Sequence, residues 1–154
     1  MGVLGVIAGD TIVESKYSID ASEGLVRLQV WGELRAEGLI RLMAQVGADP
    51  RHRVDMCAII DLREAHGDWD YSEVQRLRDY VARIAAPQFR PQQRRWAAIV
   101  SPGTLVAAAH VLIVITDSVA EHIRMQLFED GQTALKWVRA GQRALELDAS
   151  AVTA

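Results

Sequence analysis

The chain has 154 residues, of which 50% are hydrophobic and 24% are charged, and its formal net charge at pH 7 is −3. This length and apolar content predict a single domain with a substantial buried core. The mild negative charge provides no general attraction for nucleic acid or for an anionic membrane surface, so we expect neither as a partner.

The composition along the chain predicts three regions and no membrane span. We expect an N-terminal arm or edge strand over residues 1–10, a folded domain over 11–146 and a C-terminal tail over 147–154. The apolar start lacks the basic residues of a secretory signal. The most apolar internal stretch, Leu105–Ile115, is far shorter than the roughly 20 residues that cross a bilayer. With Cys57 as the only cysteine, no internal disulfide can form, and we expect a cytoplasmic protein.

The pattern of residues 11–32 predicts a β-hairpin. Two stretches rich in strand-forming residues flank Asp20–Gly24, which supplies the polar residues and the glycine that a hairpin turn favours. Successive side chains of a strand point to opposite faces, so the second strand has one buried set. We expect this set to be Val26, Leu28, Val30 and Gly32.

A helix and a buried strand follow the hairpin. Apolar residues recur at spacings of three and four, which is the spacing of one helical face, until a helix end near Gly47–Pro50. They are Leu39, Leu42, Met43 and Val46. The nearly continuous apolar run Val54–Leu62 predicts a central strand that is covered on both faces. Within it, Cys57 is expected to be a small buried hydrophobic residue.

The middle of the chain repeats this alternation. Helical spacing returns at Asp70 and ends near Ala86, because the residue before a proline disfavours helix. Pro87–Arg95 is expected to be a polar, basic, solvated connection, and Trp96–Ser101 to be a strand. Pro102 can open the next helix, since proline is tolerated in a first turn.

The end of the chain predicts one more strand and one more helix. Ile123–Phe128 alternates as a strand, and Asp130 is a candidate N-cap for a helix with an apolar face formed by Ala134, Leu135 and Val138. Strands separated by helices need crossover connections and therefore pair mostly in parallel. We predict an α/β domain with a mixed, mostly parallel sheet of about five strands and helices packed mainly on one face.

Three segments resemble a known family: "GLVRLQVWGEL", "AIIDLREA" and "FEDGQTALKWV". Together with the order of elements, they are similar to the SpoIIAA-like proteins, relatives of STAS domains (sulfate transporter and anti-sigma-factor antagonist). The resemblance covers about residues 11–140. It implies a STAS-like fold. We expect a non-enzymatic regulatory role, without a cofactor. Modules of this kind dock lipids, nucleotides or partner proteins.

The resemblance also directs attention to Ser72. Anti-sigma-factor antagonists carry a phosphorylated serine in a D-S-S-G motif at the start of a helix, and the nearest stretch here is Asp70-Tyr71-Ser72-Glu73. Ser72 is therefore the phosphorylation candidate, although its alignment needs a one-residue insertion. Glu73 replaces the motif's glycine, and its carboxylate would repel a phosphate. We favour the alternative in which Asp70 or Ser72 is a helix N-cap.

No pattern of residues predicts catalysis or a metal site. The four histidines do not show the close spacings that metal sites favour. His66 and Asp68 could pair a general base with a carboxylate, but they belong to a polar loop and lack a nucleophile. Arg90, Arg94 and Arg95, beside aromatic residues, could form a nucleic-acid patch, and the net negative charge argues against it. We therefore expect no enzyme activity, no metal and no nucleic-acid partner.

The segment Leu105–Val119 is the most unusual feature of the sequence, because apolar residues would surround nearly the whole circumference of a helix. We consider three explanations: burial within the same chain, a homodimer contact, or a pocket for an apolar ligand. The expected contact residues are Leu105, Val106, Ala109, Leu112, Ile113 and Val119.

We favour a cytoplasmic, homodimeric regulatory or protein-interaction module that uses this helix as its contact and that can also bind another protein. The alternative is a carrier or sensor of a lipid or other apolar small molecule. That ligand would lie between this helix and the C-terminal helix, near Leu112 and Trp137.

Overall fold

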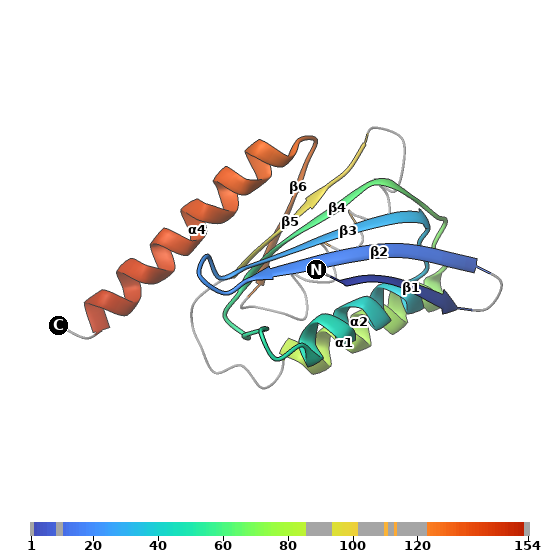
Figure 1. Ribbon diagram of the computed structural model, residues 1–154, viewed down its shortest axis with the longest axis horizontal. Coiled ribbons are helices and arrows are strands. Elements are labelled where there is room, and N and C mark those ends of the chain that lie inside the picture. Colours follow the sequence, from blue (N-terminus) through green and yellow to red (C-terminus); the bar gives the residue numbers. More distant parts are fainter. Residues whose placement is uncertain are drawn as a thin grey trace.

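The computed structural model describes residues 2–8, 11–85, 94–101, 110, 113 and 123–152 of the chain. In these residues, six strands form one sheet whose spatial order follows the chain, β1-β2-β3-β4-β5-β6 (Figure 1). Each strand therefore lies beside its neighbours in sequence.

The sheet begins with three antiparallel strands. β1 (Gly2–Ala8) pairs with β2 (Thr11–Asp20), which pairs with β3 (Leu25–Glu33). The hairpin turn contains Gly24 at a φ of 63°, a left-handed conformation that glycine adopts without strain. Most of the expected N-terminal arm is thus an edge strand, and the sheet has one strand more than the predicted five.

The remaining strands pair in parallel. β3 is followed along the sheet by β4 (Cys57–His66), β5 (Arg94–Ile99) and β6 (Ile123–Phe128). The crossovers contain α1 (Ala36–Ala48) between β3 and β4, and α2 (Tyr71–Ala85) between β4 and β5. The predicted mixed, mostly parallel α/β architecture is confirmed.

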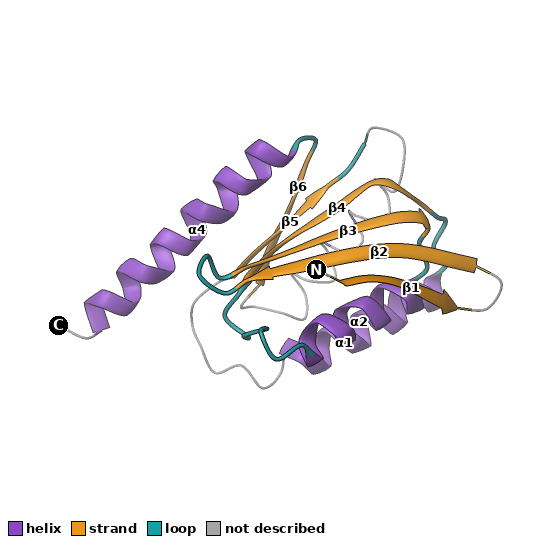
Figure 2. Ribbon diagram, in the orientation of Figure 1, coloured by secondary structure: helices purple, strands orange, loops and turns teal. Residues whose placement is uncertain are grey.

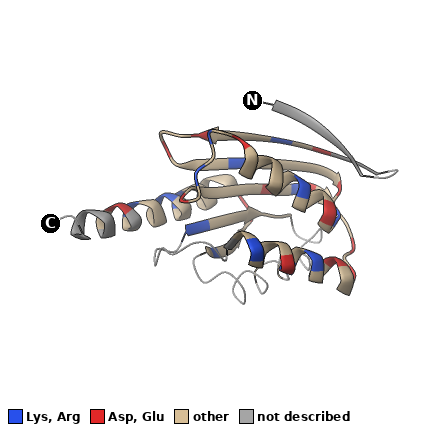
Figure 3. Cartoon of the chain, turned by 90° about the horizontal axis from the view of Figure 1, so that it is seen from below, with Lys and Arg blue, Asp and Glu red and all other residues tan. Residues whose placement is uncertain are grey.

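The helices cover both faces of the sheet unequally. α1 and α2 lie side by side on one face, and α4 (Gly131–Val152) lies on the other (Figures 1 and 2). Ile113, a helical residue between β5 and β6, packs against the same core cluster as α1 and α2. Two of the three described helices, together with Ile113, thus lie on one face, in agreement with the prediction. Acidic and basic residues are interspersed on the outer sides of α1 and α2 (Figure 3).

Each face has its own apolar cluster. The larger cluster joins the sheet to α1 and α2 and includes Val30, Leu39 and Leu77. The smaller cluster joins it to α4 and consists of Leu25, Cys57, Ile59, Ala97, Ile99, Ala134 and Val138. Cys57 is 1% exposed, as expected, and this burial raises the pKa of its thiol.

The predicted ends of β4 and of the last helix were wrong. β4 runs from Cys57 to His66 rather than ending at Leu62, because its pairing with β3 continues past a bulge to His66. α4 continues to Val152 without a tail at Leu147, since residues 142–152 contain neither glycine nor proline. The C-terminal part of α4 extends beyond the sheet (Figure 1), and Leu147 is 71% exposed.

Truncating Leu77 tests the larger cluster. Its side chain is completely buried, so Leu77→Ala should lower the free energy of unfolding by about 2–5 kcal/mol through lost burial and a new cavity. The exposed Leu147→Ala is the control and should change it by less than about 0.5 kcal/mol. Urea unfolding followed by tryptophan fluorescence measures both. Equal effects in the two variants would contradict this account of the core.

Candidate functional site

The candidate site lies at the carboxyl ends of β3 and β4, where α1 and α2 begin. The two strand ends are joined by a hydrogen bond of 2.7 Å from the Leu34 amide to the His66 carbonyl. The Leu34 carbonyl accepts a hydrogen bond of 2.8 Å from the indole of Trp69. A Cβ at Gly67 would lie 2.5 Å from that carbonyl oxygen, so only glycine fits there. These contacts hold the loop between β4 and α2 against the sheet.

A capping box starts α2. The Asp70 carboxylate accepts a hydrogen bond of 2.9 Å from the Glu73 amide, and the Glu73 carboxylate accepts one of 3.3 Å from the Asp70 amide. This reciprocal pair satisfies two backbone donors near the helix start. The Glu73 amide and then the Ser72 hydroxyl lower the pKa of Asp70. The predicted capping role of Asp70 is confirmed.

Glu73 also caps α1. Its other carboxylate oxygen accepts a hydrogen bond of 3.4 Å from the Ala36 amide, in the first turn of α1. The Arg35 guanidinium lies 3.5 Å from the carboxylate, although the Arg35 side chain does not itself cap the helix. Glu73 is only 8% exposed. One buried carboxylate therefore faces the positive ends of two helix dipoles.

Ser72 lies on the solvent side of this cap. It is exposed, and its hydroxyl donates a hydrogen bond of 2.8 Å to Asp70. A phosphate at this position would replace that bond and place new negative charge beside Asp70 and Glu73. The contacts thus give Ser72 a supporting role in the cap, and its phosphorylation stays a prediction.

Tyr71 is the conspicuous exposed residue at this helix start. It is 75% exposed, and its hydroxyl accepts a hydrogen bond of 3.1 Å from the Gln75 amide group, one helical turn later. An apolar ring is therefore presented to solvent beside Ser72. In the sequence, Tyr71 stands where the D-S-S-G motif has its first serine, and neither periodicity nor spacing indicates its exposure.

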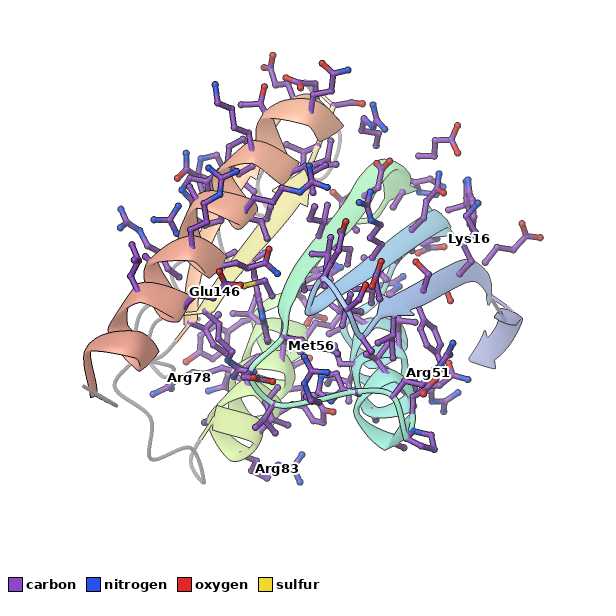
Figure 4. All side chains as sticks on the ribbon, turned by 60° about the vertical axis from the view of Figure 1, so that its left-hand side comes forward. Lys16, Arg51, Met56, Arg78, Arg83 and Glu146 are labelled. Atoms are coloured by element: carbon purple, nitrogen blue, oxygen red, sulfur yellow. The ribbon has the colours of Figure 1, made fainter. Side chains whose placement is uncertain are left out.

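Two other carboxyl groups with lowered pKa values, those of Asp49 and Asp61, form hydrogen bonds with nearby side chains. Arg51 and Tyr17 hydrogen-bond the Asp49 carboxylate just after α1, and these contacts, those with Arg51 first, place the pKa of Asp49 far below its usual range. Figure 4 shows Arg51 beside the end of this helix. Arg63 lowers the pKa of Asp61 in the same way. These groups are firmly ionised at neutral pH, whereas a general acid requires a raised pKa.

The other chemical candidates do not form a site in the described residues. His66 and Asp68 are both exposed. Among the residues that the structure describes, no three His, Cys, Asp or Glu side chains lie close enough to hold a metal ion.

The predicted interaction helix is described at two residues only. His110 is exposed, and Ile113 is partly buried against the larger core cluster. Ile113 thus contacts its own chain. The other predicted contact residues lie outside the described residues: Leu105, Val106, Ala109, Leu112 and Val119.

Trp137 packs against its own chain on the opposite face of the sheet. Its ring centre lies 5.4 Å from that of Phe128, and the Arg95 guanidinium lies 4.9 Å from it. Arg95 also donates a hydrogen bond of 2.7 Å to the Trp137 carbonyl. Leu112 lies outside the described residues, so a ligand pocket between Leu112 and Trp137 stays a prediction.

Arg94 and Arg95 do not belong to a solvated connection, contrary to expectation. β5 begins at Arg94, whose side chain turns inward and is only 7% exposed, while Arg95 lies against Trp137. Strand pairing sends adjacent side chains to opposite faces, so each arginine meets a different layer of helices. The strand was expected to begin at Trp96, so the sequence pattern did not indicate that Arg94 and Arg95 belong to it.

Comparison with known proteins supports the fold. No family model and no curated protein matches the sequence. The structure is similar to the crystal structure of an uncharacterized protein of the DUF3478 family from Shewanella loihica PV-4, which is described as having a SpoIIAA-like fold. The TM-score is 0.53 at 16% sequence identity, and the match covers 87% of this chain and 99% of that one.

This chain has a SpoIIAA-like fold. The fold expected from the sequence resemblance is thereby confirmed, and the match extends over most of both chains. In the described part of the molecule, no helix has the length and apolar character to cross a membrane.

Removing the Glu73 carboxylate tests the shared cap. Glu73→Ala should lower the free energy of unfolding by about 1–3 kcal/mol, because it leaves the buried Ala36 amide and the partly buried Asp70 amide without this acceptor. Glu37→Ala is the matched control, since Glu37 is exposed and forms an ion pair with Arg41 one turn away on α1. Chemical denaturation compares the two. A Glu73 variant as stable as the Glu37 variant would rule out the bridging role.

Proposed function

We propose that this chain is a non-enzymatic regulatory module of the SpoIIAA-like type that acts by binding other proteins. The observation that carries the proposal is the 75% exposure of Tyr71 on a capped helix start. In the sequence resemblance, this is where antagonists carry their regulatory serine. The departures at Tyr71 and Glu73 favour constitutive binding over a phosphorylation switch.

The local geometry suits a docking surface. Tyrosine is enriched in protein interfaces because it presents a large apolar ring with a polar tip. The capping box and the Trp69 hydrogen bond hold the helix start in one conformation, so binding would cost little ordering. Asp49 and Asp61 have lowered pKa values, which suit a structural role better than the role of a general acid.

The proposed module is cytoplasmic and forms a homodimer through Leu105–Val119. The support for this contact is the apolar sequence of the segment. A helix of this sequence would have few polar side chains to face the solvent, so its apolar surface needs a further cover. A self-complementary contact between identical helices would cover such a surface.

Replacing Tyr71 by the photo-cross-linking residue p-benzoylphenylalanine tests the docking surface. In the cells that make this protein, irradiation should give a cross-linked species of defined mass from position 71. The same replacement at Leu147, which is 71% exposed on α4, is the control and should give no such species. Equal products at both positions, or none at position 71, would contradict a protein contact at α2.

Sedimentation equilibrium tests the homodimer. The wild type should have twice the mass of one chain, and Leu112→Asp should shift it toward monomer, because a charge in an apolar contact is not solvated. Leu147→Asp introduces the same charge at an exposed position and should leave the mass unchanged. A monomeric wild type at high concentration would exclude this contact.

A further inference from the structure

A cavity of about 350 Å³ lies between the sheet and the C-terminal halves of α1 and α2. Its wall is mainly apolar and comes from four parallel strands and both helices. Representative lining residues are Leu28, Met43, Ile60, Val81, Ile84 and Met125. The cavity lies on the opposite face from Trp137, so it differs from the pocket that the sequence predicts.

The end of α1 leaves this space open. Gly47 lines the cavity, and outside its own stretch of helix no atom of the described residues lies within 4 Å of the place where its Cβ would be. Val54, in the connection to β4, also lines it and is 55% exposed, which is unusual for a large hydrophobic residue. Apolar side chains therefore lead from the solvent into the cavity.

One part of the wall is positively charged. Arg94 lines the cavity although it is only 7% exposed, and its guanidinium donates to the Val54 carbonyl. The guanidinium lies 5.9 Å from the ring centre of Trp96, another lining residue. His52 lines the same cavity, and burial and then the charge of Arg94 lower the pKa of its ring. The lowered pKa favours the neutral form of the His52 ring, so Arg94 carries the positive charge of this part of the wall.

We propose that this cavity binds a single-chain amphiphile with one carboxylate, of the medium-chain fatty acid class. The chain lies along the apolar wall, and the carboxylate faces Arg94 and His52. The volume is at the lower end of the roughly 300–1,000 Å³ found for small-molecule sites, which suits one short chain. An arginine shielded from water favours a carboxylate over a neutral head group. This binding is independent of the proposed protein contacts at Tyr71 and Leu105–Val119.

Octanoate and 1-octanol are matched probes, because they share a chain length and differ in the charge of the head group. Isothermal titration of the full-length wild type at pH 7 should show octanoate binding with a dissociation constant at least about tenfold below that of 1-octanol. Arg94→Leu should remove this preference by weakening octanoate alone.

Gly47→Leu provides a variant that does not disturb a buried charge. Its side chain would enter the open space beside α1 and should weaken both probes by about tenfold or more. Ala48→Leu is the matched control, because it adds the same side chain at the next exposed position, which does not line the cavity, and should bind like wild type. Circular dichroism confirms that each variant is folded.

Three results would overturn the proposal. The first is no octanoate binding by the wild type, as expected if another part of the chain fills the space. The second is equal affinity for octanoate and 1-octanol. The third is unchanged binding in folded Gly47→Leu. None of these bears on cross-linking at position 71 or on the sedimentation of the chain, so the two proposals fail separately.

Discussion

The arrangement of α1 and α2 depends on one buried carboxylate. Glu73 accepts hydrogen bonds from the amides of Asp70 and Ala36, so the two helices begin beside one another at the same edge of the sheet. Parallel strands require their crossover helices to start near this edge, and each start exposes amides that lack partners within the helix. By satisfying donors of both helices, Glu73 fixes the edge that presents Tyr71 and directs the opposite ends of the helices toward the cavity.

The two faces of the sheet consequently differ in character. α4 covers part of one face through a small cluster around Cys57 and Val138, where Trp137 packs against Phe128 and Arg95. On the other face the helices meet the sheet tightly near the cap, and a cavity remains toward their C-terminal ends. The well-packed cap and the open far end together give a rigid frame with room for an apolar guest. Tight packing of the whole interface would exclude such a guest.

Much of this fold follows from periodicity in the sequence. Leu39, Leu42 and Val46 predict the buried side of α1, and Val26 and Val30 predict the inner face of β3, because each pattern depends only on local geometry. The expected buried set of β3 leaves out Leu25, yet Leu25 is 1% exposed because it packs in the cluster beneath α4. A long-range contact of that kind leaves no periodic signal in the strand itself.

The candidate sites were less accessible to prediction. The sequence indicates Asp70 as a cap, but the second role of Glu73 depends on α1 lying beside it in space. Arg94 belongs to a polar, basic stretch that is typical of a loop. It lines the cavity because its position in β5 directs its side chain toward α1 and α2. The cavity itself is lined by residues from four strands and two helices, and no single segment encodes that combination.

The agreement between strand order in space and along the chain has a consequence for biosynthesis. In the described sheet, every strand pairs only with the strands made just before and just after it. A ribosome releases the antiparallel β1–β3 meander first, and this ready-made template can receive β4, β5 and β6 one at a time. No strand has to wait for a distant partner or be inserted between two that have already joined, so the nascent protein exposes a single growing edge.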